Sequence, residues 1–403
     1  MTPEQESVLQ AIQQKENVFI TAPAGYGKSY VIQRVVQWAK EESISFGITA
    51  MTGAAAILIN GRTLHSFLGI GLGKNTAEEL ANQCKKYIQR KLRKLSLLIV
   101  DEISMLDHQL FDKISTYLSI LRNQPDIPFG GVQLVFSGDM FQLPPVKGDY
   151  CFMSKTWSQC NFKVIQFTKN MRQQNDIPFQ KILESVRVGK CSTQELEQLK
   201  VLSDTEFTNG IVPTRLYSLN IDVDRINQAE LQELVNKTNP ILKTYSIRYY
   251  QNETQLKPIV KSMNVPEIIQ LCKEAQVVLT RNIDTNIGLV NGSRGVVIDV
   301  KDESVLVKFQ DDFVYDIAYF LHEEDNKSLF SYIPLRLAYA LSIHKCQGMT
   351  LDAIEIDLGD SIFCYGQAYT ALSRAKNLQS IRLVDVDPKS FRTHPAVLNF
   401  YKN

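Results

Sequence analysis

Three features that would confine the protein to particular classes are missing from its 403 residues. No apolar run approaches the roughly 20 residues of a membrane-spanning helix. The N-terminal residues form neither a secretory signal nor a transit peptide, and the seven cysteines, which lie between Cys84 and Cys364, contain no C-x-x-C pair. We therefore expect an intracellular protein with reduced thiols and no zinc site, cytoplasmic in a prokaryote or virus, with a nuclear or mitochondrial location left open.

An excess of charge of either sign is also missing, since 44 basic residues stand against 43 acidic ones. This balance neither requires nor excludes a nucleic-acid partner. One dense basic run, "KKYIQRKLRK", covers residues 85–94. Such a run can meet phosphates, or it can be the solvated face of a surface helix.

Short apolar runs rich in branched residues alternate with segments that suit helices. The first set lies at residues 17–22, 46–50, 95–102 and 132–139, and the second at 214–219, 275–280, 353–358 and 380–386. Such runs are typical of buried parallel strands in α/β domains. From Gly292 to about Pro334, three closely spaced runs alternate apolar and polar residues, which indicates antiparallel strands. The sequence thus predicts two α/β units and a small β insert in the second.

The segment "APAGYGKS", residues 22–29, follows the first predicted strand and precedes a helical pattern. It fits the phosphate-binding loop G-x-x-x-x-G-K-[ST], except that Ala22 replaces the first glycine. In such a loop, backbone N–H groups and the positive end of the helix surround phosphate oxygens. We expect positive φ or a close phosphate approach at Gly25 and Gly27, and a negative φ at Ala22, where alanine is then tolerable.

Two adjacent acids, Asp101 and Glu102, follow the apolar run "LLIV". The Asp101 carboxylate and the Ser29 hydroxyl suit Mg²⁺, and Glu102 is placed to activate the water that attacks the γ-phosphate of ATP. The alternative is an ordinary helix N-terminus, which also favours acids. Because phosphate transfer to a substrate does not require an activated water, the acid pair favours ATP hydrolysis.

Nine segments along the chain carry a resemblance to one family. They are "TPEQESVL", "APAGYGKS", "TAMTGAAAILINGRTLHSFLGIG", "DEISML", "GDMFQLPPV", "MRQ", "GLVNGSRGVV", "SIHKCQGMTLD" and "AYTALSRAK". With these motifs in family order from Gln5 to Arg374, the chain resembles the Pif-type 5′-to-3′ DNA helicases of superfamily one, class B.

The resemblance implies roles for five residues at an ATP site. Gln5 matches the glutamine that reads adenine, Lys28 the lysine on the β- and γ-phosphates, and Gln142 the glutamine that senses the γ-phosphate. Arg172 and Arg374 match two arginines that reach the nucleotide across an interdomain cleft, although either one alone can be read as a structural ion pair. The expected ATP contacts are Gln5, Ala22, Pro23, Ala24, Gly25, Tyr26, Gly27, Lys28, Ser29 and Tyr30.

The resemblance also implies a track for single-stranded DNA. Small hydroxyl and imidazole groups at loop ends suit phosphate contacts without sequence readout, and Phe67 is a candidate for stacking on bases. Each residue has an alternative role in helix capping or core packing. The expected DNA contacts are Thr52, His65, Phe67, Pro144, Pro145, His344 and Thr350.

For the whole chain, the resemblance implies two RecA-like P-loop NTPase domains. We expect the first over residues 1–165, with a small wedge element at about 66–94, and the second over 166–403, interrupted by an SH3-like insert at 293–335. The expected activity is ATP- and Mg²⁺-dependent unwinding of DNA in the 5′-to-3′ direction, in replication, repair or recombination. A translocase that strips proteins or remodels RNA, and an ATP-gated binding module, remain alternatives.

The expected partners are single-stranded DNA and tailed or forked duplexes, bound by a monomer, with a dimer on DNA left open. Besides Ala22, two features depart from the family. Glu274 stands where relatives usually have glycine before a strand, and the extra N- and C-terminal segments of many relatives are missing, so we expect a bare motor.

Overall fold

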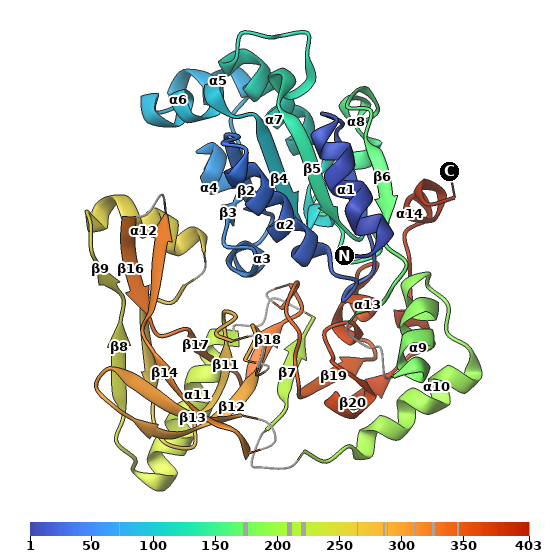
Figure 1. Cartoon of the computed structure of the whole chain (residues 1–403). Helices are drawn as coiled ribbons and strands as arrows, with labels where there is room; N and C mark the ends of the chain where they lie inside the picture. The colour runs from blue at the N-terminus through green and yellow to red at the C-terminus, as the bar shows by residue number, and fades with distance from the viewer. Residues whose placement is uncertain are drawn as a thin grey trace. The chain divides into compact units, whose positions relative to one another are not determined.

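The computed structural model describes residues 1–71, 73–171, 176–207, 212–218, 223–263, 265–284, 287, 289–309, 312–324, 327–344 and 346–402. The chain divides into two compact units, Met1–Gln174 with His394–Asn403, and Asn175–Thr393 (Figure 1). The sequence-based division differs from this one in two places: it ends the first unit at residue 165 instead of 174, and it assigns the last ten residues, which belong to the first unit, to the second. Within the described ranges, no helix has the length and apolar character needed to cross a membrane.

The first unit is built on a parallel sheet with the strand order β3-β2-β4-β5-β1-β6. β1 and β4 are buried along their whole length, as expected where helices cover both faces of a parallel sheet. The four predicted strands of this unit are confirmed as β1, β2, β4 and β5. The strands are β1 Val18–Thr21, β2 Phe46–Ala50, β3 Arg62–Thr63, β4 Leu97–Asp101, β5 Gln133–Gly138 and β6 Lys163–Gln166.

Most helices of the first unit begin at side chains that accept hydrogen bonds from free N–H groups of the first turn, and the exceptions are α2 and α6. Thr2 and Gln5 form a capping box on α1, and Asp107 caps α7 by accepting from the N–H of Leu110 at 2.8 Å. The helices are α1 Pro3–Gln13, α2 Lys28–Glu41, α3 Gly53–Leu58, α4 Leu64–Leu68, α5 Ala77–Gln83, α6 Lys86–Lys94, α7 His108–Leu121, α8 Lys155–Gln159 and α14 Pro395–Phe400.

The second unit also holds a parallel sheet, in the order β18-β7-β19-β20. Three of the predicted strands, at 214–219, 353–358 and 380–386, are confirmed in it. The strands are β7 Thr214–Tyr217, β18 Ala340–Ser342, β19 Ile354–Leu358 and β20 Ile381–Val386, and the helices of the unit are α9 Ile177–Arg187, α10 Thr193–Lys200, α11 Val223–Thr238, α12 Glu253–Ser262 and α13 Gln367–Leu372.

The other strands described in the second unit pair antiparallel, in the orders β14-β13-β12-β11-β17, β15-β16-β9 and β10-β8. The predicted antiparallel insert is confirmed. The strands are β8 Lys243–Ser246, β9 Arg248–Tyr249, β10 Ile268–Leu271, β11 Gln276–Leu279, β12 Arg294–Val300, β13 Ser304–Phe309, β14 Val314–Ala318, β15 Phe320–Glu324, β16 Lys327–Tyr332 and β17 Leu335–Leu337.

The prediction for residues 275–280 is wrong in one respect. They form β11, but β11 pairs antiparallel with β12 and β17 and does not join the parallel sheet. Its four residues are all buried, and a short buried run of branched residues has the same pattern in both kinds of sheet. The α/β class, with two parallel sheets and a β insert, is otherwise confirmed.

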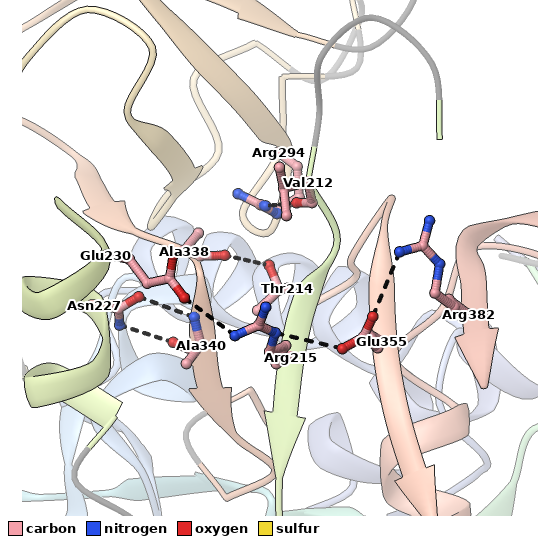
Figure 2. A network of polar contacts seen from close by, with 10 residues as sticks. All are labelled: Val212, Thr214, Arg215, Asn227, Glu230, Arg294, Ala338, Ala340, Glu355 and Arg382. Carbon is pink, nitrogen blue, oxygen red and sulfur yellow. Dashed lines mark hydrogen bonds and ion pairs between the residues drawn. The ribbon is translucent and has the colours of Figure 1, made fainter. Parts of the chain in front are cut away.

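Polar side chains tie the second parallel sheet to its surroundings (Figure 2). The Arg215 guanidinium lies 3.2 Å from the Glu230 carboxylate on α11 and 3.5 Å from that of Glu355 on β19, which also lies 3.6 Å from Arg382. Arg294 is fully buried and donates to the carbonyls of Val277 and Val212. Burial lowers the pKa of this guanidinium to about 10, with Asp352 acting in the opposite direction.

Candidate nucleotide site

Three strand ends of the first sheet define the site. In the sheet order, β4, β5 and β1 are neighbours, and Thr21 at the end of β1 lies opposite Gly138 at the end of β5. Parallel strands bring their carboxyl ends to one edge, which is where α/β folds bind ligands. The residues at these strand ends and just after them are therefore held close together: the loop 22–27, the pair Asp101–Glu102, and the segment 139–142.

The loop after β1 has the backbone that the sequence predicts. Gly25 and Gly27 have φ values of 87° and 83°, and Ala22 does not have a positive φ. A Cβ atom on Gly27 would lie 2.9 Å from the Gln5 amide nitrogen. Glycine is thus required at this position both by the left-handed backbone and by the close approach of Gln5.

Lys28 begins α2 and is buried beneath the loop. Its Nζ donates to the carbonyls of Ala22 at 2.7 Å and Pro23 at 3.0 Å. The N-cap of this helix is Gly27, which has no side chain to accept hydrogen bonds from the first turn. The first-turn N–H groups and the helix dipole therefore favour an anion at this end, and Ser29, half-buried, is the second residue of the helix.

Asp101 and Glu102 are both buried at the end of β4, with exposed fractions of 3% and 6%. The Glu102 N–H donates to Asp101 Oδ1 at 2.9 Å. Burial, followed by repulsion from Glu102, raises the pKa of Asp101 to about 6, while Lys28 acts to lower it. Glu102 has φ 54° and ψ 45°, a left-handed conformation that is uncommon for a residue with a Cβ.

The donor atoms fit Mg²⁺ bound together with a nucleotide. Asp101 and Ser29 offer a carboxylate and a hydroxyl, both hard oxygen ligands. Among the described residues, no cluster of three or more His, Cys, Asp or Glu could hold a metal ion by itself. A protein site with few ligands suits Mg²⁺, which usually keeps several waters and binds substrate phosphates.

Gln142 lies in the segment after β5 and is 1% exposed. Its N–H donates to the Asp139 carbonyl at 3.0 Å, which closes a tight turn at residues 139–142. Gln5, also buried, accepts from the Thr2 N–H through Oε1 at 3.0 Å. This bond directs one end of the Gln5 amide to the capping box and leaves the nitrogen end at Gly27.

The two arginines expected to contact nucleotide differ in what the structure describes. Arg172 lies outside the described residues, but the N–H of its neighbour Met171 donates to the Gly25 carbonyl at 2.9 Å. Arg374 follows α13 in the second unit and is 1% exposed. Its guanidinium donates to the carbonyls of Thr370 at 3.0 Å and Met349 at 3.3 Å, and to the Ser373 hydroxyl at 2.9 Å.

Among the expected DNA contacts of the first unit, Phe67 is placed unfavourably. Its ring is 6% exposed, packs against Gly47, and has the Lys91 ammonium 4.7 Å from its centroid. A ring enclosed in this way has no open face for a base, so the structure argues against stacking by Phe67. The sequence around Phe67 did not indicate that its side chain would be buried.

The remaining expected DNA contacts are half-buried or buried. Thr52 Oγ1 caps α3 by accepting from the Ala55 N–H at 3.2 Å, and burial lowers the pKa of His65 and of His344. Thr350 is held by Gly292, whose φ is 99° and where an added Cβ would collide with the Thr350 carbonyl. Pro144 is half-buried and Pro145 buried, whereas Thr52, His65, His344 and Thr350 are all half-buried.

One residue at the site was not predicted. Tyr401 belongs to the C-terminal segment, and its hydroxyl contacts Thr21, the last residue of β1, and Met140, which lies two residues before Gln142. The segment "NFYKN" matches no motif. Because its partners lie some 260 to 380 positions earlier in the chain, no local pattern signals the contact.

Comparisons with known proteins identify relatives of the whole chain. Residues 1–197 match the model of the PIF1-like helicase, and residues 259–300 match that of the DNA helicase Pif1 2B domain. The chain is 38% identical to the ATP-dependent DNA helicase PIF1 of Homo sapiens, across 100% of this chain and 63% of the human protein. It thus spans less than two-thirds of that relative's length.

Two solved structures are similar over the whole chain. The Pif1 helicase from Candida albicans has a TM-score of 0.79 and 32% identity, and the alignment covers 100% of this chain and 99% of that one. The Pif1 helicase from Bacteroides in complex with ADP-AlF3 and ssDNA has a TM-score of 0.70 and 29% identity, with 100% and 96% covered.

Proposed function

Because the chain belongs to the PIF1-like helicase family, we propose that it is an ATP-dependent DNA helicase that moves 5′-to-3′ along single strands and unwinds duplex or structured DNA. The observation that carries this proposal is the meeting of three strand ends in the first unit. They bring the phosphate loop, the Asp101–Glu102 pair and Gln142 to one edge of the sheet.

The arrangement supports a division of roles at a nucleotide. Lys28 and the first turn of α2 bind phosphates, since they combine a positive charge with N–H groups at a helix N-terminus. Asp101 and Ser29 would hold Mg²⁺, which would neutralise charge on the phosphates. Glu102 orients and deprotonates the attacking water, and the buried Gln142 amide senses the γ-phosphate.

The DNA substrate and the direction of movement come from the family alone. The Bacteroides relative was solved with ssDNA, which supports single strands as the partner of this chain. Backbone contacts to phosphates release counterions, so affinity for single strands should fall as the salt concentration rises. The 5′-to-3′ direction has no basis in the composition or spacing of the sequence.

The proposal is tested by two assays on the same preparation. ATP turnover is measured with and without saturating single-stranded DNA, and strand displacement is measured on duplexes that carry a 5′ or a 3′ tail. We expect DNA-stimulated turnover and unwinding of the 5′-tailed duplex only. The Lys28→Ala variant, which loses a charge from the phosphate loop, should bind single strands but lack both ATP turnover and strand displacement.

Other outcomes identify the alternatives. DNA-stimulated turnover without strand displacement would indicate a translocase or remodeller. Slow turnover that DNA does not stimulate would indicate an ATP-gated binding module. Unwinding of the 3′-tailed duplex would contradict the proposed direction, and normal turnover by Lys28→Ala would contradict the assignment of the phosphate loop.

A further inference from the structure

The C-terminal segment returns from the second unit to pack on the first. It follows Thr393, the last residue of the second unit, and forms α14, the red helix near the C-terminus in Figure 1. Phe400 stacks on Phe152 with ring centroids 4.3 Å apart and lies 6.1 Å from Phe19 of β1. Together with the fully buried Val397, these aromatic contacts dock the segment by apolar burial.

The next residue, Tyr401, makes polar contacts of a different kind. Its phenol oxygen accepts a hydrogen bond from the Met140 N–H at 3.3 Å and shares a second one with the Thr21 hydroxyl. Its ring stacks on Phe141 with centroids 4.8 Å apart and an interplanar angle of 22°. A single side chain therefore joins the end of β1 to the segment that follows β5.

Both contacts lie within two residues of the nucleotide machinery. Thr21 immediately precedes Ala22, the first residue of the phosphate loop, and Met140 and Phe141 immediately precede Gln142. The Met140 N–H belongs to the tight turn at residues 139–142. Movement of that turn would shift the Gln142 amide relative to the loop, and a misplacement of about 1 Å can cost about 10²-fold in rate.

We propose that Tyr401 is a positioning residue for ATP hydrolysis. Its hydroxyl holds the segment 139–142 in place relative to the phosphate loop. The inference rests on the proposed function, since it concerns the same ATP site. It adds a residue from the opposite end of the chain, outside every motif of the family resemblance. The action of Tyr401 runs through Thr21 and Met140, which its hydroxyl contacts.

The test is Tyr401→Phe, which removes the hydroxyl and keeps the ring that stacks on Phe141. We expect the kcat of DNA-stimulated ATP hydrolysis to fall about three- to tenfold, the equivalent of one neutral hydrogen bond, with KM for ATP within about twofold. In nucleotide-free protein, hydrogen exchange at the Met140 amide should be faster by a similar factor, because its acceptor is gone.

Tyr117→Phe is the matched control. The Tyr117 hydroxyl, in the same unit, donates to the Leu68 carbonyl at 2.9 Å. Its removal should lower the melting temperature about as much as Tyr401→Phe does, but leave kcat and the exchange of residues 139–142 unchanged. Equal effects of the two variants on kcat would reduce Tyr401 to a general structural role and overturn the proposal.

Thr21→Val tests whether the hydroxyl acts as a bridge. If the two hydroxyls act through one contact, the double variant should be no slower than the slower single variant. Effects that multiply would contradict a shared bridge. The parent protein distinguishes failure of the proposed function from failure of the positioning role. If the parent has no DNA-stimulated turnover, the proposed function is contradicted. If the parent and the Tyr401→Phe variant both have normal turnover, only the positioning role is contradicted.

Discussion

Each unit of the molecule holds a glutamate in the left-handed region of backbone space, and the two glutamates differ in burial and in their charged surroundings. Glu102 follows β4 in the first unit with φ 54°, and Glu274 precedes β11 in the second with φ 72°. Glu102 is 6% exposed and lies beside a second buried carboxylate, whereas Glu274 is exposed to solvent. Left-handed backbone costs a residue with a Cβ about 1–2 kcal/mol in both places.

The comparison separates strain that serves a site from strain that does not. At Glu102 the unusual backbone coincides with burial, with a neighbouring carboxylate of raised pKa and with the end of a parallel strand. Glu274 has no such surroundings: it lies in an exposed turn before β11, and its N–H donates to the Val297 carbonyl of β12 at 2.7 Å. Backbone strain points to function only where burial and charge occur with it.

The largest expected effect separates the two glutamates by chemistry. Glu102→Gln should lower ATP turnover about 10²–10⁴-fold, as for loss of a positioned general base, while ATP binding is retained. Glu274→Gln makes the same chemical change in the second unit and should leave turnover unchanged. Steady-state turnover and binding of a fluorescent ATP analogue give both answers. If Glu102→Gln fails to bind ATP, the division of roles between Asp101 and Glu102 is incorrect.

A second difference between the units concerns charge, since the first buries carboxylates at its strand ends and the second buries the Arg374 guanidinium. If Arg374 contacts the nucleotide, as the family resemblance implies, Arg374→Ala should lose about 10³-fold in DNA-stimulated turnover. ATP and DNA affinity should stay within about tenfold. Turnover with and without saturating single-stranded DNA, in the parent and the variant, is the measurement.

The control for this variant is Arg382→Ala. Arg382 lies on β20, pairs with Glu355 at 3.6 Å, and is partly exposed. Its removal should leave stimulation by DNA intact. Because Arg374 is buried, a melting curve and Arg374→Lys, which keeps the charge, distinguish loss of folding from loss of function. Full stimulation in a folded Arg374→Ala protein would exclude a role in phosphate chemistry.

The sequence predicted the first unit better than the second, for a physical reason. The phosphate loop, β4 and its acid pair are local features, in which a strand, a turn and a helix follow one another within about 15 residues. The antiparallel pairing of β11 with β12 and β17 depends on partners as far away as Leu337, and a buried apolar run does not encode its partner. The burial of Phe67 and the Tyr401 contacts are tertiary in the same sense.

Asp101 provides the third prediction, a change in stability of about 1–3 kcal/mol. Since folding raises its pKa from 3.8 to about 6, its stabilising contribution is present below the unfolded pKa and is lost as the pH rises through about 6. Asp101→Asn, which cannot ionise, should therefore exceed the parent in free energy of unfolding at pH 8, by an amount that shrinks towards pH 4. Urea unfolding without Mg²⁺ measures this.

The same Asp101→Asn variant should lose Mg²⁺-dependent turnover, so the substitution exchanges activity for stability. Asp357→Asn is the matched control, because Asp357 lies near the end of β19 in the second sheet and its Oδ1 accepts from the Gly359 N–H at 2.8 Å, a bond that asparagine can keep. Turnover of this control should equal that of the parent. A pH-independent difference between Asp101→Asn and the parent would show that burial of the carboxylate is not the cause.

The smallest expected effect returns to Glu274. Glycine has no Cβ to strain at positive φ, and the exposed Glu274 side chain loses no buried contact when it is removed. Glu274→Gly should therefore raise the free energy of unfolding by about 0.5–1 kcal/mol, after the entropic cost of glycine in the unfolded chain is subtracted.

Glu274→Ala keeps the Cβ and should not raise the free energy of unfolding. Glu274→Asn should fall between the alanine and glycine variants, because asparagine tolerates this region of backbone space. Urea unfolding ranks the three variants, and ATP turnover should be the same in all of them. Equal stability of the glycine and alanine variants would mean that the side chain, and not the backbone, sets the cost at this turn, and the parallel drawn with Glu102 would then fail.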